Sequence, residues 1–226
     1  NVETDEFFDY SPEFVFLNRF PYDYRPDAAE APGIVDTIRD IANDDKEVEA
    51  LIYEAIGNCF YLLNSFRGSV MLYGKGKNGK STLLNMILQV VGRQNASHLS
   101  LHNLSGRFML SEVYGKAANI GDDIPETYIP DTSTFKKVAT GDPVMAEEKG
   151  KDPFSFTPYA KLFFSMNALP PVGDKSAGFF SRILIVPLNR VFEQGNGANV
   201  GLKSRKWSKK EMEYLVKLSV DGLKRL

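Results

Sequence analysis

The segment Gly74–Ser81 constrains the fold of this 226-residue chain more than any other feature, because it matches the pattern G-x-x-x-x-G-K-S/T of a phosphate-binding loop. Such a loop requires a strand before it and a helix after it. The apolar run at residues 69–73 predicts a buried strand, and residues 82–91 predict a helix that ends at Gly92. The alternative, a hairpin turn rich in Gly and Lys, leaves this flanking pattern unexplained. The sequence therefore predicts a nucleotide-binding α/β domain.

Each position of the loop has a chemical task. The glycines let backbone N–H groups curl around a triphosphate, and the N-terminus of the following helix adds its partial positive charge. Lys80 is expected to reach the β- and γ-phosphates, and the hydroxyl of Ser81 is expected to bind Mg²⁺. The expected nucleotide-binding residues are Gly74, Gly76, Asn78, Gly79, Lys80, Ser81 and Thr82.

Composition limits the class of protein. A hydrophobic content of 43% supports one large α/β domain with helical extensions. The net charge of −2 argues against a protein that coats nucleic acid through bulk positive charge, so any DNA contact is expected to be local. The single cysteine, Cys59, excludes an internal disulfide framework and a cysteine-rich zinc site, which suits a reducing compartment.

The sequence contains no apolar run long enough to span a bilayer and no signal peptide, so we expect a soluble, cytoplasmic protein. Because the first residue is Asn1 rather than Met, we also expect a fragment of a longer polypeptide.

Three regions are expected along the chain. Residues 1–66 form an N-terminal arm, irregular up to about residue 43 because prolines punctuate it, followed by a helix from Asp44 to about Phe66. Residues 67–192 form the nucleotide-binding core. Residues 193–226 form a loop rich in Gly and Asn and a last helix.

The last helix begins with the capping box Ser208–Glu211 and presents apolar residues on one side. Its basic residues favour a solvated face over a DNA-binding one. The loop before it, residues 194–201, is expected to be mobile.

Polar residues follow two further apolar strands. Asp122 and Asp123 end a short strand at residues 117–121, and Asn167 ends a strand at residues 160–166. We assign Asp122 to Mg²⁺, Asp123 to activation of the attacking water, and Asn167 to orientation of that water against the γ-phosphate. The alternatives are an exposed acidic turn for the two carboxylates and an ordinary strand-ending turn for the amide.

Residues 144–156 predict a β-hairpin, because apolar or aromatic runs flank a Lys-Gly-Lys turn. Lys149 and Lys151 at its tip form a compact pair that suits a phosphate backbone. On these residues alone, solvated turn lysines are the favoured reading and DNA contact is the alternative.

The order of these elements resembles the superfamily 3 helicases. The motifs are the phosphate loop, Asn119–Asp123, Phe135–Asp142 with the hairpin after it, the strand to Asn167, and Phe179–Arg182. The resemblance is greatest to the helicase part of phage and plasmid primase-helicases, which are related to the poxvirus primase-helicase. The segment Tyr24–Pro32 resembles the lead-in of that family, so the likeness covers roughly residues 10–192.

The resemblance implies an AAA+-type P-loop fold with a parallel sheet, which uses ATP and Mg²⁺ and assembles into a homo-hexameric ring around single-stranded or forked DNA. It implies that Arg182 is the arginine finger and that Lys149 and Lys151 belong to a DNA-tracking hairpin. Other replication proteins are possible partners. A phage or plasmid gene would place the protein in the host cytoplasm. Asp123 departs from the Glu that is commoner in this motif.

Three other functions share parts of this pattern. A non-unwinding AAA+ initiator or loader would have every ATP-site residue and differ only in translocation and strand separation. A small-molecule kinase or GTPase is disfavoured because no Asn-Lys-x-Asp motif and no evident substrate lid occur. A subunit that binds ATP without hydrolysis is disfavoured because the catalytic elements are all present.

Overall fold

A parallel β-sheet forms the centre of the computed structural model, which describes residues 4, 6–9, 11–13, 15–63, 68–193 and 201–226. Its strands are β1 (Ser69–Tyr73), β2 (Ala96–Ser97), β3 (Ala118–Gly121), β6 (Lys161–Met166) and β7 (Ile183–Pro187). They lie in the order β2-β3-β6-β1-β7, and every neighbouring pair is parallel. All five strands therefore end at the same edge of the sheet. The predicted α/β class with a parallel sheet is confirmed.

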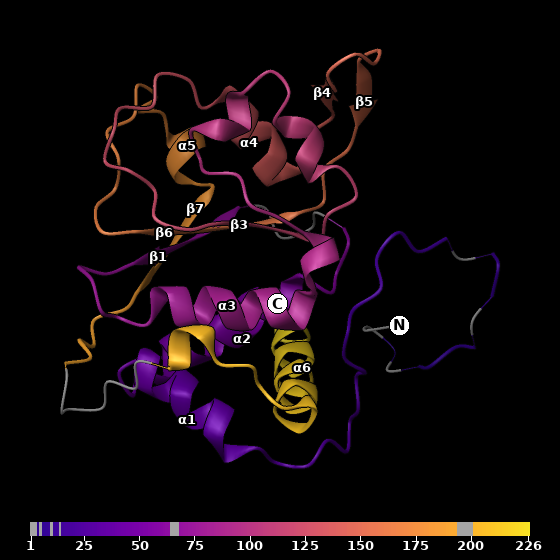
Figure 1. Ribbon diagram of the computed structural model, residues 1–226, viewed down its shortest axis with the longest axis vertical. Helices are drawn as coiled ribbons and strands as arrows, with labels where there is room; N and C mark the ends of the chain where they lie inside the picture. The colour runs from indigo at the N-terminus through magenta and orange to yellow at the C-terminus, as the bar shows by residue number, and fades with distance from the viewer. Residues whose placement is uncertain (1–3, 5, 10, 14, 64–67, 194–200) are drawn as a thin grey trace.

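Helices cover both faces of the sheet (Figure 1). They are α1 (Pro32–Ile41), α2 (Lys46–Asn58), α3 (Lys80–Val91), α4 (Ser133–Thr140), α5 (Ala177–Phe180) and α6 (Lys209–Leu223). The 3-10 turns are η1 (Arg93–Asn95), η2 (Asn103–Ser105), η3 (Leu110–Val113) and η4 (Leu202–Ser204). One face carries α1, α2, α3 and α6, and the other carries α4 and α5. Beside α4 projects an antiparallel hairpin of β4 (Val144–Ala146) and β5 (Phe154–Phe156).

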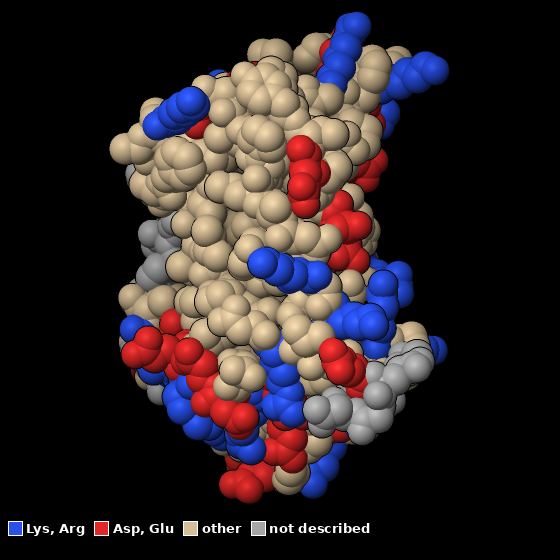
Figure 2. Space-filling view, turned by 90° about the vertical axis from the view of Figure 1, so that its left-hand side faces the viewer, with Lys and Arg blue, Asp and Glu red and all other residues tan. Residues whose placement is uncertain are grey.

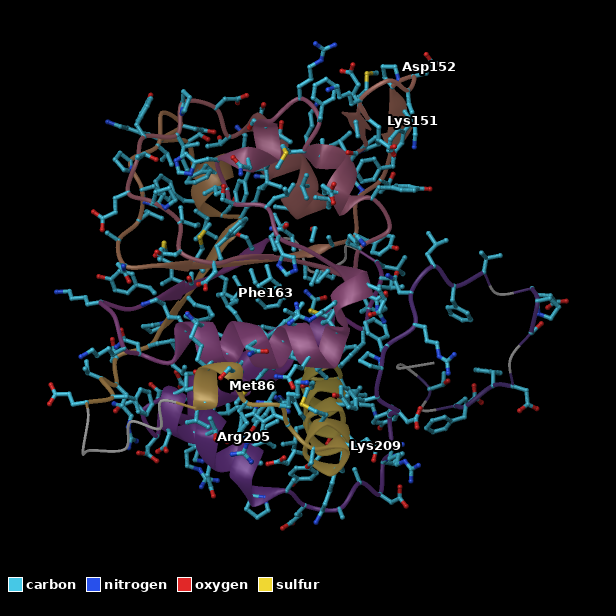
Figure 3. All side chains as sticks on the ribbon, in the orientation of Figure 1. Met86, Lys151, Asp152, Phe163, Arg205 and Lys209 are labelled. Carbon is cyan, nitrogen blue, oxygen red and sulfur yellow. The ribbon has the colours of Figure 1, made fainter. Side chains whose placement is uncertain are left out.

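Each face of the sheet has its own apolar core. Alternate side chains of β6 point to opposite faces, so Phe163 packs in the core that contains Met86 of α3. Leu162 and Phe164 pack in the second core, together with α4. Figure 3 labels Phe163 and Met86 on the facing elements. All six residues of β6 are buried, as expected for a strand that is covered on both sides.

The helices α2 and α6 approach each other at glycines. A Cβ atom added to Gly57 would lie 2.0 Å from the carbonyl oxygen of Ser219, and one added to Gly222 would lie 2.9 Å from the amide nitrogen of Glu54. Both distances are too short for any larger side chain in a close-packed interior. This contact joins α2, which precedes the phosphate loop, to α6 at the end of the chain, so both helices lie in the same layer on one face of the sheet.

The prediction of an irregular arm up to residue 43 was wrong over α1. Pro32 stands at the start of this helix, where its missing N–H is not needed. Ile34, Ile38 and Ile41 bury one helical face. The prolines around this segment favoured a prediction of irregular structure, although the spacing of the three isoleucines is that of a helix.

The predicted helix from Asp44 to Phe66 is also shorter in the structure. It ends at Asn58, and the chain turns so that the ring of Phe60 packs edge-on against Phe20 of the arm, with 5.0 Å between centroids. Residues 64–67 of the predicted helix lie outside the described part. The loop expected at residues 194–201 also lies outside it, apart from Gly201.

Candidate active site

The phosphate loop connects β1 to α3, as the sequence predicts, and its glycines meet specific backbone requirements. Gly76 and Gly79 have φ angles of 109° and 82°, in the region that favours glycine. Gly74 has no room for a side chain, because an added Cβ would lie 2.8 Å from the carbonyl oxygen of Leu188. The loop therefore keeps its backbone accessible at the start of α3, where unpaired N–H groups favour an anion.

Asn78 fixes the loop to the segment after β7. The side chain is 3% exposed, and its Nδ2 donates a hydrogen bond of 2.7 Å to the carbonyl oxygen of Arg190. Arg190 in turn pairs with Asp40 at 2.8 Å, at the end of α1. Asn78 thus lines the pocket, while its amide holds the loop in place.

Lys80 is the first residue of α3 and points into the pocket. Its ammonium group donates to the carbonyl oxygen of Gly74 and, at 3.0 Å, to Oδ1 of Asn167. Partial burial lowers the pKa of Lys80, and the nearby carboxylates of Asp123 and Asp122 oppose that shift. The cation is therefore placed between a backbone carbonyl, an amide and a pair of carboxylates.

The predicted strand-end residues meet at one pocket of about 360 Å³. Asp122 and Asp123 follow β3, and Asn167 follows the adjacent strand β6. Because parallel strands end at one edge, the two carboxylates and the amide converge on the phosphate loop. The pocket is lined by Gly76, Lys77, Asn78, Gly79, Lys80, Ser81, Thr82, Asp122, Asp123, Ser165, Asn167 and Lys203.

Ser165 was not predicted from the sequence, although it holds the acidic pair together. Its Oγ donates a 2.6 Å hydrogen bond to Oδ1 of Asp122 and accepts a 2.8 Å hydrogen bond from the backbone N–H of Asp123. Asp123 has a φ angle of 51°, an unusual conformation for a residue with a side chain. The two-residue period of a strand could have identified Ser165, because Ser165 lies two residues before Asn167 and so points to the same face of the sheet.

Lys203 is a further pocket residue that was not predicted, and it lies outside every predicted motif. It belongs to η4, more than a hundred residues after the phosphate loop. No local spacing connects it to the loop, so only the tertiary structure places it there.

Arg182 lies away from the pocket of its own chain. It directly precedes β7, whose residue Ile183 is level with Ser69 at the start of β1. The phosphate loop follows the other end of β1, about 13 Å along a five-residue strand. Nη1 of Arg182 donates to the carbonyl oxygen of Gly178, and among the described residues no carboxylate pairs with its guanidinium.

The predicted hairpin is present as β4 and β5, with Lys149 and Lys151 on its turn. It projects at the upper right of Figure 1, and Figure 3 labels Lys151 at its tip. Lys151 pairs with Glu148, whereas Lys149 has no ion pair in the part of the chain that the structure describes. The space-filling view in Figure 2 shows basic side chains at this end of the molecule, above a largely uncharged face.

A bidentate ion pair holds the hairpin at Glu147, the first residue after β4 on the turn side. The guanidinium of Arg107 donates to both carboxylate oxygens of Glu147 at 2.9 Å, and these bonds lower the pKa of that carboxyl group. The hairpin is thus tied to the loop between η2 and η3.

The described residues contain no group of three or more His, Cys, Asp or Glu side chains that could hold a metal ion. The oxygen ligands in the pocket include the carboxylates of Asp122 and Asp123 and the hydroxyl of Ser81. This set suits Mg²⁺, which binds through one or two carboxylates together with substrate phosphates and water. Within the described residues, no helix is long and apolar enough to cross a membrane.

The fold and the pocket together define an α/β P-loop domain in which polar strand ends face a phosphate-binding loop. The protein family described as "Family of unknown function (DUF5906)" matches residues 72–182, from β1 to Arg182. The "Putative helicase L207/L206" of Acanthamoeba polyphaga mimivirus is 23% identical in an alignment of 173 positions that covers 70% of this chain and 17% of the viral protein.

Two solved structures of the NrS-1 C-terminal region share the fold. The A form of the apo structure has a TM-score of 0.68 and 15% identity, and a second apo structure has a TM-score of 0.66 and 13% identity. Each alignment covers 96% of this chain and 51% of the solved chain, so this chain spans about half of either structure. The chain is thus similar in sequence to a putative helicase and in fold to the NrS-1 C-terminal region, and these likenesses confirm the helicase-family resemblance predicted from its motifs.

Proposed function

We propose that this chain is the ATP-dependent DNA helicase domain of a phage- or plasmid-type primase-helicase. The observation that carries the proposal is the single pocket in which the phosphate loop, two strand-end carboxylates and Asn167 surround Lys80. This arrangement has the parts that phosphoryl transfer requires: a phosphate cradle, a cation, a metal-binding carboxylate and a polar group for the attacking water.

Lys80 binds the β- and γ-phosphates of ATP in this proposal. Its present acceptors, the carbonyl of Gly74 and the amide oxygen of Asn167, are neutral. Phosphate oxygens are anionic and make stronger hydrogen bonds to an ammonium group. When Lys80 turns to phosphate, the amide of Asn167 becomes available to orient a water molecule, and Asp123 accepts its proton.

Ser81 and Asp122 are the residues proposed to hold Mg²⁺, since both line the pocket. Ser165 engages Oδ1 of Asp122, which leaves the other carboxylate oxygen for the ion. Bound there, Mg²⁺ would neutralise charge on the β- and γ-phosphates.

Two features outside the pocket support assembly and DNA binding. Arg182 is at the opposite edge of the sheet from the phosphate loop, so we propose that it reaches the ATP site of a neighbouring subunit in a homo-hexameric ring. Lys149 and Lys151 stand on a projecting turn, so we propose that they contact the DNA backbone within that ring.

The alternative function is a non-unwinding AAA+ initiator or loader. The mimivirus relative is named a putative helicase, which favours the unwinding function. Both functions use the same ATP site, and strand separation alone distinguishes them.

An ATPase assay with and without single-stranded DNA, combined with unwinding of a forked duplex, tests the proposal. Lys80→Ala and Asp122→Asn should each lower ATP turnover by more than about a hundredfold, because each removes a charge that acts on the transferring phosphate. Lys75→Ala is the matched control, since Lys75 is exposed in the same loop and does not line the pocket.

Parental turnover in either pocket variant would contradict the assignment of the site. ATP turnover that DNA stimulates, without unwinding of the fork, would instead favour the initiator or loader.

A further inference from the structure

The segment from Leu202 to Trp207 is fastened across the exposed side of α3. Nδ2 of Asn85 donates a 2.5 Å hydrogen bond to the carbonyl oxygen of Lys203, and Nε2 of Gln89 donates to the carbonyl oxygen of Arg205 at 2.8 Å. Oε1 of Gln89 also accepts from the backbone N–H of Trp207 at 3.2 Å. Two side chains of the helix that follows the phosphate loop therefore determine where this segment lies.

Figure 1 shows the segment, in yellow, against α3, and Figure 3 labels Arg205 below Met86 of that helix. The guanidinium of Arg205 stacks 4.0 Å above the ring of Trp207 and pairs with Glu211 at 2.8 Å. Arg205 and Trp207, which lead into α6, thus contact each other, and Arg205 also pairs with Glu211 of that helix.

Lys203 differs from Arg205 and Trp207 because it lines the pocket. It lines the same cavity as Ser81 and Thr82 of α3. Its ammonium group forms no ion pair with any described residue. An exposed cation that lines a pocket and lacks a carboxylate partner is suited to an anionic ligand.

The position of Lys203 along α3 indicates which phosphates of a bound nucleotide Lys203 would contact. Asn85 lies one helical turn beyond Ser81, so the backbone of Lys203 is held on the side of the pocket where α3 continues. The γ-phosphate end is marked by Asn167, which contacts Lys80, and by the two carboxylates. The loop backbone itself binds the α- and β-phosphates.

We propose that Lys203 is a nucleotide-binding residue that contacts the α- and β-phosphates from the C-terminal segment. This inference rests on the proposed function, because it assigns Lys203 to the same nucleotide site. The pocket then has three lysines, Lys77, Lys80 and Lys203, against the carboxylates of Asp122 and Asp123. A nucleotide bound there connects η4 to the phosphate loop.

Equilibrium binding of fluorescent N-methylanthraniloyl derivatives of ATP and ADP to Lys203→Ala tests the inference. We expect the affinity for both nucleotides to fall by about tenfold at low salt, since one charge-assisted contact is lost. Lys203→Arg keeps the charge and should retain most of the affinity. Lys206→Ala is the matched control, because Lys206 is an exposed cation of the same segment that does not line the pocket.

The outcomes separate the inference from the function on which it rests. Parental affinity in Lys203→Ala, together with loss of binding in Lys80→Ala, overturns the role of Lys203 and leaves the nucleotide site standing. Weaker binding of ATP with unchanged binding of ADP overturns the α- and β-phosphate assignment. A parental protein that binds neither nucleotide refutes the proposed function and, with it, this inference.

Discussion

Replacing Ser165 with alanine tests whether the hydrogen bonds around the acidic pair are needed for ATP turnover. The substitution removes the 2.6 Å bond to Asp122 and the acceptor of the Asp123 N–H, and it adds no atoms to a strand that is already buried. Without that acceptor, the unusual backbone of Asp123, at φ 51°, loses a contact that holds it. Both carboxylates then have more freedom to turn away from the phosphate loop.

The size of the effect follows from the bond to the carboxylate. A short O–H···O⁻ contact is charge-assisted and contributes about 1.5–3 kcal/mol. At about 1.36 kcal/mol for each factor of ten in rate, complete loss of this contribution lowers kcat by about 10- to 150-fold. The Mg²⁺ concentration needed for half-maximal turnover should rise as well, since Ser165 positions the proposed metal-binding carboxylate.

The assay is steady-state ATP hydrolysis over a range of Mg²⁺ concentrations, accompanied by urea unfolding. Ser97→Ala is the control, because Ser97 is buried in β2 and donates a 2.9 Å hydrogen bond to Asn119 outside the pocket. It should lose stability without a change in Mg²⁺ dependence. If Ser165→Ala also lost only stability, with parental kcat and Mg²⁺ dependence, the positioning role of Ser165 would be refuted.

Two further predictions concern residues outside the pocket. Neutralising Lys149 and Lys151 together should weaken binding to single-stranded DNA and reduce the slope of log K against log salt by about 1.4, because two fewer counterions are released. Basal ATPase activity should persist. An unchanged slope in a salt titration would instead support the interpretation of these lysines as solvated turn residues. Arg182→Ala subunits should bind ATP but hydrolyse it poorly, and mixing them with Lys80→Ala subunits should restore part of the activity where an intact loop meets an intact finger. No recovery in rings shown to contain both variants would remove Arg182 from the catalytic residues.

Local spacing was enough to predict the elements around the phosphate loop. Gly79 and Gly92 bound α3 because a left-handed or otherwise unusual backbone is needed at each end of that helix. The capping box at Ser208 is formed as predicted, because it involves groups only three residues apart. The turn at Gly150, with a φ angle of 79°, closes the predicted hairpin.

The convergence of Asp122, Asp123 and Asn167 was also predictable, for a topological reason. Each residue ends a strand, and in a parallel sheet all strands end at one edge, so identifying the strands already placed these side chains near the loop. Ser165 was missed because a serine within a buried apolar strand is not distinctive by itself, and only its place two residues before Asn167 on the same face of the strand distinguishes it.

Tertiary packing alone decided the rest. The sequence determined the phosphate loop, the parallel strands and the residues at their ends, because backbone conformation and strand period act over a few neighbouring positions. Only the folded chain brings α6 against α2 at Gly57 and fastens Lys203 to Asn85. It alone separates Arg182 from its own phosphate loop. These relations join segments that are far apart in the chain, and they depend on which surfaces fit together rather than on any local spacing.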